Sequence, residues 1–128
     1  MSFKGVCMKI QEIIGQWKED PEFIRNVGMV LCHYGTVRGT SRKGGKTVVS
    51  VNVTPDDERI EALRRECEQR PGIHRIAVEA HGGLLRPGDD LLYILVAGDF
   101  RENVKAVLSE LLERIKTEAV TKEEMLTD

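Results

Sequence analysis

The sequence predicts a single-domain α+β fold, because helix-like and strand-like segments follow one another in the order α(α)ββαββα. The length of 128 residues suits one domain, and the apolar fraction of 41% is sufficient for a buried core. Within each pair of consecutive strands, the connection is too short for a classical parallel crossover. No repeat, low-complexity tract or linker divides the chain.

Residues 1–27 are predicted to form an N-terminal helical segment. Apolar side chains recur at the i, i+3, i+4, i+7 spacing of an amphipathic helix, namely at Ile10, Ile13, Ile14 and Trp17. Asp20-Pro21 then ends this helix and starts a second short turn through Phe23 and Ile24. The segment is therefore predicted to be one helix followed by a short helical turn.

The core is predicted to span residues 28–119 and to begin with two strands. Residues 28–37 are rich in β-branched and aromatic side chains, which is typical of a buried strand, and residues 48–53 form the second strand. Thr54 is expected to cap the helix that follows, with Pro55 at its first position.

The second half of the core is predicted to hold two further strands and a long helix. Residues 73–79 alternate in polarity, which places Ile73 and Arg75 on the same face of a strand. Asp99 is expected to open the last helix through a capping box. Residues 120–128 lack apolar periodicity and are predicted to form a mobile tail.

Composition and charge exclude several classes of protein. The chain has 19 Lys+Arg and 21 Asp+Glu, a net charge of −2, which argues against a nucleic-acid-binding face but is compatible with a small anionic substrate. The longest apolar run, Leu91–Ala97, is far shorter than the ~20 residues that span a bilayer. The first ten residues lack the apolar core of a signal peptide, so we expect a cytoplasmic protein.

The three cysteines predict neither a disulfide framework nor a zinc site. Cys7, Cys32 and Cys67 are odd in number, widely spaced and contain no CxxC pair. No paired-histidine or HExxH spacing occurs either. The sequence therefore predicts no bound metal and no cofactor.

Two stretches are candidates for binding an anion. The loop Arg38–Lys46 carries four cations and three glycines, and its glycines allow backbone N–H groups to approach a ligand. The alternative interpretation is a solvated hairpin tip. Lys116 follows the apolar stripe of the last helix, although a cation there is also expected from the helix dipole alone. The histidines His33, His74 and His81 are interpreted as structural.

Four motifs together resemble the catalytic large subunit of molybdopterin synthase. They occur in the expected order over about residues 28 to 124, as Gly35-Thr36-Val37-Arg38, Leu85-Arg86-Pro87-Gly88-Asp89-Asp90, Arg101 and Ile115-Lys116-Thr117-Glu118-Ala119. The resemblance implies an α/β-hammerhead-like fold and a homodimer. It also implies that each end of the dimer binds a small ubiquitin-like sulfur carrier with a C-terminal Gly-Gly thiocarboxylate.

The activity implied by this resemblance is the conversion of cyclic pyranopterin monophosphate to molybdopterin by installing a dithiolene. It assigns catalytic roles to Lys116 and Lys122, and substrate phosphate binding to Arg38. Arg101 is implied to reach the site from the neighbouring subunit. The full set of implied substrate-binding residues is Thr36, Val37, Arg38, Phe100, Arg101, Glu123 and Glu124.

The chain departs from the family pattern around these residues. Phe100 stands where the family usually carries histidine, and Ala119-Val120-Thr121-Lys122 is one residue shorter than the usual run, so that Lys122 matches only across a gap. These departures leave two alternatives open. One is a non-catalytic binding or regulatory paralogue that keeps the dimeric scaffold, and the other is a generic anion-binding domain that uses the basic loop.

Overall fold

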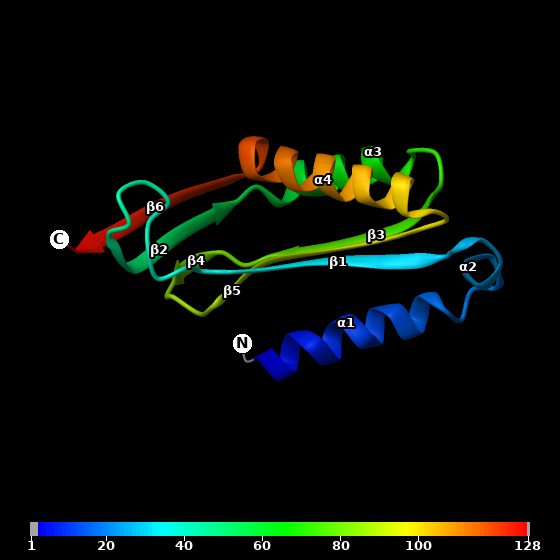
Figure 1. The fold of residues 1–128 in the computed structure, drawn as a ribbon, viewed down its shortest axis with the longest axis horizontal. Coiled ribbons are helices and arrows are strands. Elements are labelled where there is room, and N and C mark those ends of the chain that lie inside the picture. The colour runs from blue at the N-terminus through cyan, green and yellow to red at the C-terminus, as the bar shows by residue number, and fades with distance from the viewer. Residues whose placement is uncertain (1–2, 128) are drawn as a thin grey trace.

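The computed structural model describes residues 3–127 and confirms a mixed α+β fold in a single domain (Figure 1). The elements follow one another as α1 (Phe3–Trp17), α2 (Pro21–Asn26), β1 (Met29–Thr36), β2 (Thr47–Pro55), α3 (Asp57–Glu68), β3 (Ile73–Ala80), β4 (Gly83–Leu85), β5 (Asp90–Gly98), α4 (Arg101–Glu118) and β6 (Val120–Thr127). The predicted elements are present, and the structure adds β4 and β6. None of the described helices is both long and apolar enough to cross a membrane.

The first sheet is antiparallel with the order β1-β5-β3, and it separates two helical layers. Figure 1 shows α1 along one face and α3 with α4 along the other. Alternate residues of the central strand β5 enter the two cores, with Ile94 and Val96 packed on the α3–α4 side and Leu95 on the α1 side. Burial on both faces explains why this strand is a continuous apolar run in the sequence.

The second sheet has the order β4-β2-β6 and corrects the prediction of a mobile tail. Residues 120–127 form strand β6, which pairs antiparallel with β2 from Pro55 opposite Val120 to Thr47 opposite Thr127. Asp128 lies outside the described residues. Most side chains of β6 are exposed, so backbone hydrogen bonds rather than burial stabilise the strand. An edge strand of this kind has no apolar periodicity to detect.

Two predicted helix caps are wrong by one or two residues. Strand β2 continues through Thr54 to Pro55, and Asp56 caps α3 by accepting a hydrogen bond from the Arg59 backbone N–H at 3.1 Å. At α4 the cap residue is Phe100 rather than Asp99. The Asp99 carboxylate instead accepts hydrogen bonds from the Phe100 backbone N–H at 2.5 Å and the Asn103 amide at 2.9 Å. A polar side chain therefore lies at the start of each helix, but the exact cap residue depends on where the preceding strand, β2 or β5, ends.

The predicted alternation of β3 is confirmed from Arg75 to Glu79 but is wrong at Ile73, where the register shifts. The pairing with β5 is irregular between Ile73 and Arg75, so these two residues face opposite sides of the sheet. Ile73 packs with the α3–α4 core, whereas Arg75 reaches Asp20 on the α1–α2 side. The extra residue in the strand is His74, as in a β-bulge.

Candidate active site

A cleft of about 650 Å³ opens where the two sheets meet the C-terminal end of α4. Its apolar walls come from both sheets and include Val51, Val53, Leu91, Leu92 and Val120. Its cations come from three separate parts of the chain, namely Arg38 and Arg42 after β1, Lys116 near the end of α4, and Lys122 in β6. The cleft thus combines an apolar lining with four positive charges.

Backbone hydrogen bonds around Arg38 fix its position just after the C-terminal end of β1. Val37 is buried and exchanges backbone hydrogen bonds with the turn after β4, donating to Asp89 O at 2.9 Å and accepting from Gly88 N at 2.8 Å. Arg38 Nε donates to Thr40 O at 2.9 Å. The terminal guanidinium nitrogens then remain available for a bidentate contact with an oxyanion.

Lys116 and Lys122 flank the junction between α4 and β6. Buried Ala119 separates the two elements, and its carbonyl accepts a hydrogen bond from Asp56 N at 2.7 Å. The pKa of Lys122 lies below its ordinary value because the cleft desolvates the ammonium group and because Lys116 and Arg42 are nearby cations. The two lysines are therefore close enough to repel each other.

None of the four cleft cations forms an ion pair with another part of the described chain. Two carboxylates also line the cleft, those of Glu113 and Glu124, and both residues are exposed. Guanidinium and ammonium groups that lack carboxylate partners can bind an anionic ligand without first breaking an internal contact. The site can therefore hold phosphate or carboxylate-like groups and stabilise negative charge as it develops.

The cleft brings together six of the nine residues that the resemblance implied, which are Thr36, Val37, Arg38, Lys116, Lys122 and Glu124. Glu123 does not line it, because successive residues of β6 point to opposite faces and Glu123 pairs with Asn52 instead.

Phe100 and Arg101 lie at the opposite end of α4 from the cleft. The Phe100 residue is 66% exposed and the Arg101 side chain is 82% exposed. At 1.5 Å per residue, Arg101 and Lys116 are about 22 Å apart along the helix axis. Within one chain, Arg38 and Lys116 therefore converge and Arg101 does not.

The structure adds His33, which the sequence interpretation made structural, to the candidate site, and it selects among the cations of the basic loop. Arg42 reaches the cleft from the basic loop, whereas Lys43 and Lys46 of that loop do not line it. His33 lies on β1 beneath the end of α4, and burial together with the Lys116 charge lowers the pKa of its imidazole. His74 packs edge-on against Phe23, outside the cleft. The period-2 pattern of β1 could have placed His33 on the same face as Leu31, but not beside a particular helix residue.

The remaining titratable groups add no metal site in the described part of the chain. No cluster of three or more histidine, cysteine or acidic side chains has the geometry to hold an ion there. Cys67 is a buried thiol, Cys32 is exposed on β1, and the side chain of Cys7 lies outside the described residues. The chemistry of the cleft rests on its cations and on one imidazole.

These features define the chain as an α+β protein with a cationic cleft between two small antiparallel sheets. The sequence model of the MoaE protein family matches residues 8–118. The chain therefore belongs to the MoaE family, and its role lies in molybdenum cofactor biosynthesis. The resemblance found in the sequence is confirmed at the level of the family.

Solved structures with the same fold support this assignment. Molybdopterin synthase from Staphylococcus aureus aligns with a TM-score of 0.70 and 20% identity, covering 89% of this chain and 85% of that chain. Molybdopterin cofactor biosynthesis protein E from Burkholderia multivorans aligns with a TM-score of 0.68 and 24% identity, covering 91% and 80%. A complex of subunits 1 and 2 of molybdopterin-converting factor from Helicobacter pylori aligns with a TM-score of 0.64 and 15% identity, covering 91% of this chain and 78% of that chain. No curated protein sequence matches the chain.

Proposed function

We propose that the chain is the catalytic large subunit of a molybdopterin synthase. In this proposal it transfers sulfur from the thiocarboxylated C-terminus of a small carrier protein to cyclic pyranopterin monophosphate, and so forms the dithiolene of molybdopterin. The observation that carries the proposal is the convergence of Arg38, Lys116 and Lys122 in one apolar-walled cleft without carboxylate partners.

The proposed substrate matches the two kinds of surface in the cleft. Arg38 binds the cyclic phosphate through its terminal guanidinium nitrogens, because a planar guanidinium can donate two parallel hydrogen bonds to an oxyanion. Val51, Val53 and Leu92 supply apolar surface for the fused rings of the substrate. Thr36 and Val37 border the same end of the cleft and fix the approach of the phosphate.

The two lysines act on the sulfur donor. The carrier's terminal thiocarboxylate is an anion, and Lys116 stabilises its charge and that of the tetrahedral intermediate formed at its carbonyl carbon. Lys122 adds a second positive charge, and its lowered pKa makes it a better proton donor than an ordinary lysine. Glu124 beside it limits the net charge of the cleft.

The proposal includes a homodimer whose second copy completes each cleft. Arg101 lies too far from Lys116 to serve the cleft of its own chain, and its side chain, paired only with the exposed Glu102, is accessible to a neighbouring subunit. Phe100 accompanies it at the start of α4. Glu123 lies outside the cleft, on the other face of β6, and in this proposal it borders the path of the carrier's terminal segment.

Reconstitution of the reaction tests the proposal. Wild-type protein, thiocarboxylated carrier and cyclic pyranopterin monophosphate should yield dithiolene product. Lys116→Ala should lower the rate by at least about 10²-fold, the cost of losing a group that stabilises transition-state charge. Lys105→Ala is the matched control, because this exposed lysine lies on the same helix outside the cleft. No product from a wild-type protein that binds the carrier would reject the proposal.

A second candidate is a binding or regulatory paralogue without sulfur transfer. Phe100 favours it, because an exposed phenyl ring replaces the imidazole usual in the family and cannot donate a hydrogen bond to an anion. Such a protein should bind the carrier with normal affinity and make no product in the same assay. Restoring the imidazole with Phe100→His should then leave the protein inactive, whereas a rise in rate would favour the enzyme.

A further inference from the structure

The cleft contains one titratable side chain that the proposed function does not use, the imidazole of His33. Its cations can donate hydrogen bonds but cannot accept a proton at neutral pH. Its two carboxylates, Glu113 and Glu124, belong to exposed residues at the rim of the cleft. A neutral imidazole is the remaining group whose ordinary pKa lies near physiological pH.

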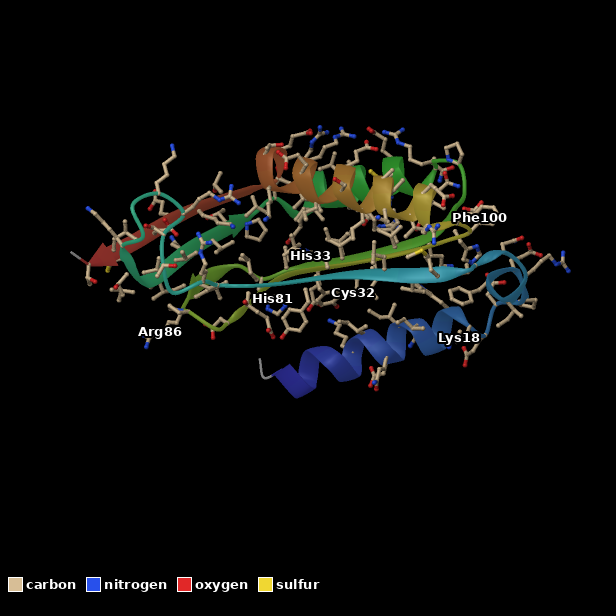
Figure 2. All side chains as sticks on the ribbon, in the orientation of Figure 1. Lys18, Cys32, His33, His81, Arg86 and Phe100 are labelled. Atoms are coloured by element: carbon tan, nitrogen blue, oxygen red, sulfur yellow. The ribbon has the colours of Figure 1, made fainter. Side chains whose placement is uncertain are left out.

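The position of the His33 ring depends on a missing methyl group at Gly35. A Cβ atom built on Gly35 would lie 2.9 Å from His33 Nε2 and 3.3 Å from Leu92 O. The ring therefore lies against the bare backbone of the same strand two residues further on. Figure 2 shows His33 on the α4 side of β1, opposite to Cys32, which is on the α1 side.

The ring nitrogens of His33 remain available to a ligand. Among the side chains of residues 9–127, neither nitrogen has a hydrogen-bond partner, and neither is a fully buried orphan. His81 differs, because its Nε2 lies 3.0 Å from Glu79 Oε2. His33 is thus a half-buried imidazole that lines the cleft beside Lys116 without an internal partner.

We propose that His33 is the proton acceptor of the cleft and acts on the water that releases the carrier. The inference rests on the proposed function, because sulfur leaves an acyl group for a substrate carbon only if the resulting thioester is cleaved. Water oxygen bonds to the acyl carbon and one water proton passes to His33. The acyl carbon–sulfur bond then breaks with its electron pair on sulfur, and His33 returns the proton to that sulfur. The products are the carrier's carboxylic acid and a substrate thiol.

The charges around the ring favour this role. The titratable and charged groups that share the cleft with His33 are Arg38, Arg42, Glu113, Lys116, Lys122 and Glu124. Burial is the larger cause and the Lys116 charge the smaller cause of a His33 pKa below 6.5. The imidazole is therefore neutral at pH 7, which is the form that accepts a proton, and it becomes protonated only as the pH falls through its lowered pKa.

The pH dependence of kcat/KM in the reconstituted reaction tests the proposal. Wild-type activity should fall on the acid side with an apparent pKa below 6.5. His33→Gln should lower the rate by about 10²- to 10⁴-fold, the usual contribution of general base catalysis, and should remove this acid limb. His81→Gln is the matched control and should preserve both. An unchanged rate and acid limb in His33→Gln would overturn the proposal.

A second variant tests the position of the imidazole while keeping His33 itself. Gly35→Ala should displace the ring and reproduce the kinetic loss of His33→Gln, while circular dichroism checks that the strand remains folded despite the 3.3 Å contact of the added methyl with Leu92 O. Wild-type kinetics in Gly35→Ala would contradict the assigned ring position.

NMR titration of the histidine rings gives a result that does not depend on turnover. Inorganic phosphate in the cleft should raise the pKa of His33, because a nearby anion favours the imidazolium. No response of His33 would overturn the inference. If the protein makes product but phosphate does not change the His33 pKa, the role of His33 is rejected and the proposed function stands. If phosphate raises the His33 pKa but no product forms, the proposed function is rejected and His33 is a residue that contacts the ligand.

Discussion

The surface shared by α3 and α4 and the cleft at the end of α4 contain the same types of charged side chain in opposite arrangements. On the helix surface, arginines bridge between carboxylates: Arg64 contacts Glu61 at 2.7 Å and Glu68 at 2.9 Å, and Arg70 contacts Glu110 at 2.7 Å. In the cleft, Arg38, Arg42, Lys116 and Lys122 have no such partners among the described residues. Figure 2 shows the charged side chains gathered above the two helices.

The difference separates two uses of charge. A paired arginine has its hydrogen-bonding capacity occupied, so it contributes a little to stability and nothing to ligand binding. In the cleft, Lys116 and Arg42 oppose the positive charge of Lys122, which costs folding free energy. Perturbed charges of this kind are typical of sites that bind a ligand. Removing a cation should therefore have opposite consequences in the two regions.

The largest effect should come from removing a cation of the cleft. Arg38→Met should raise the KM for the phosphate-bearing substrate by about 10- to 100-fold, because hydrogen bonds to charged groups contribute about 1.5–3 kcal/mol. Thermal unfolding should remain close to wild type, since among the described residues the Arg38 side chain makes one hydrogen bond, to Thr40 O. Steady-state kinetics together with calorimetry measure both. An unchanged KM would break the assignment of the cleft as the phosphate site.

The reverse result is expected on the helix surface. Arg64→Met should lower the free energy of unfolding by about 1–2 kcal/mol, because it removes the contacts with Glu61 and Glu68. Activity should be unaffected, since α3 does not line the cleft. Urea unfolding and the reconstitution assay give the two values. A loss of activity at constant stability would contradict the division into two regions.

A pH effect of similar origin should follow from Glu61. Hydrogen bonding to Arg64 lowers the pKa of Glu61 from 4.5 to about 2, so the stabilisation is present above pH 4.5 and is lost as the pH falls towards 2. Because the Glu61 side chain is 45% exposed, solvent screening leaves about 1 kcal/mol. The unfolding free energies of wild type and Glu61→Gln should differ at pH 6 and converge near pH 2. Parallel curves across this range would show that the pair contributes nothing.

The smallest change in stability is expected at Lys122, where the same substitution should have opposite effects without and with phosphate. Lys122→Met should stabilise the ligand-free protein by about 0.2–0.5 kcal/mol, because it removes the repulsion with Lys116. The same substitution should weaken the stabilisation that added phosphate confers. Differential scanning calorimetry with and without phosphate measures both changes. Destabilisation of the ligand-free protein would indicate that Lys122 has a structural role.

The sequence was sufficient to predict the elements whose burial follows a local period. The stripe of α1, the continuous apolar run of β5 and the broad face of α4 are all recorded in residue spacing, so their types were correct. Strand β6 was missed because pairing with β2, rather than burial, stabilises it. The register shift at His74 was missed for the same reason, since a bulge depends on the partner strand.

The candidate site was only partly predictable. Arg38 and Lys116 were found because motifs mark them, and both line the cleft. His33 and Arg42 carry no motif, and their place in the cleft depends on how β1 and the basic loop pack against α4 and β6. The position of Arg101 at the far end of α4 follows from helix length alone, so a role for it requires a second chain.

The single residue between α4 and β6 has a mechanical consequence. Ala119 joins the helix that covers the first sheet directly to the edge strand of the second, and its carbonyl accepts a hydrogen bond from Asp56 N. Lys116 belongs to α4, which packs on the first sheet, and Lys122 belongs to β6, the edge strand of the second sheet. The distance between the two ammonium groups is therefore set by how the second sheet is joined to the end of α4, so a substitution that alters this junction alters the spacing of the two charges.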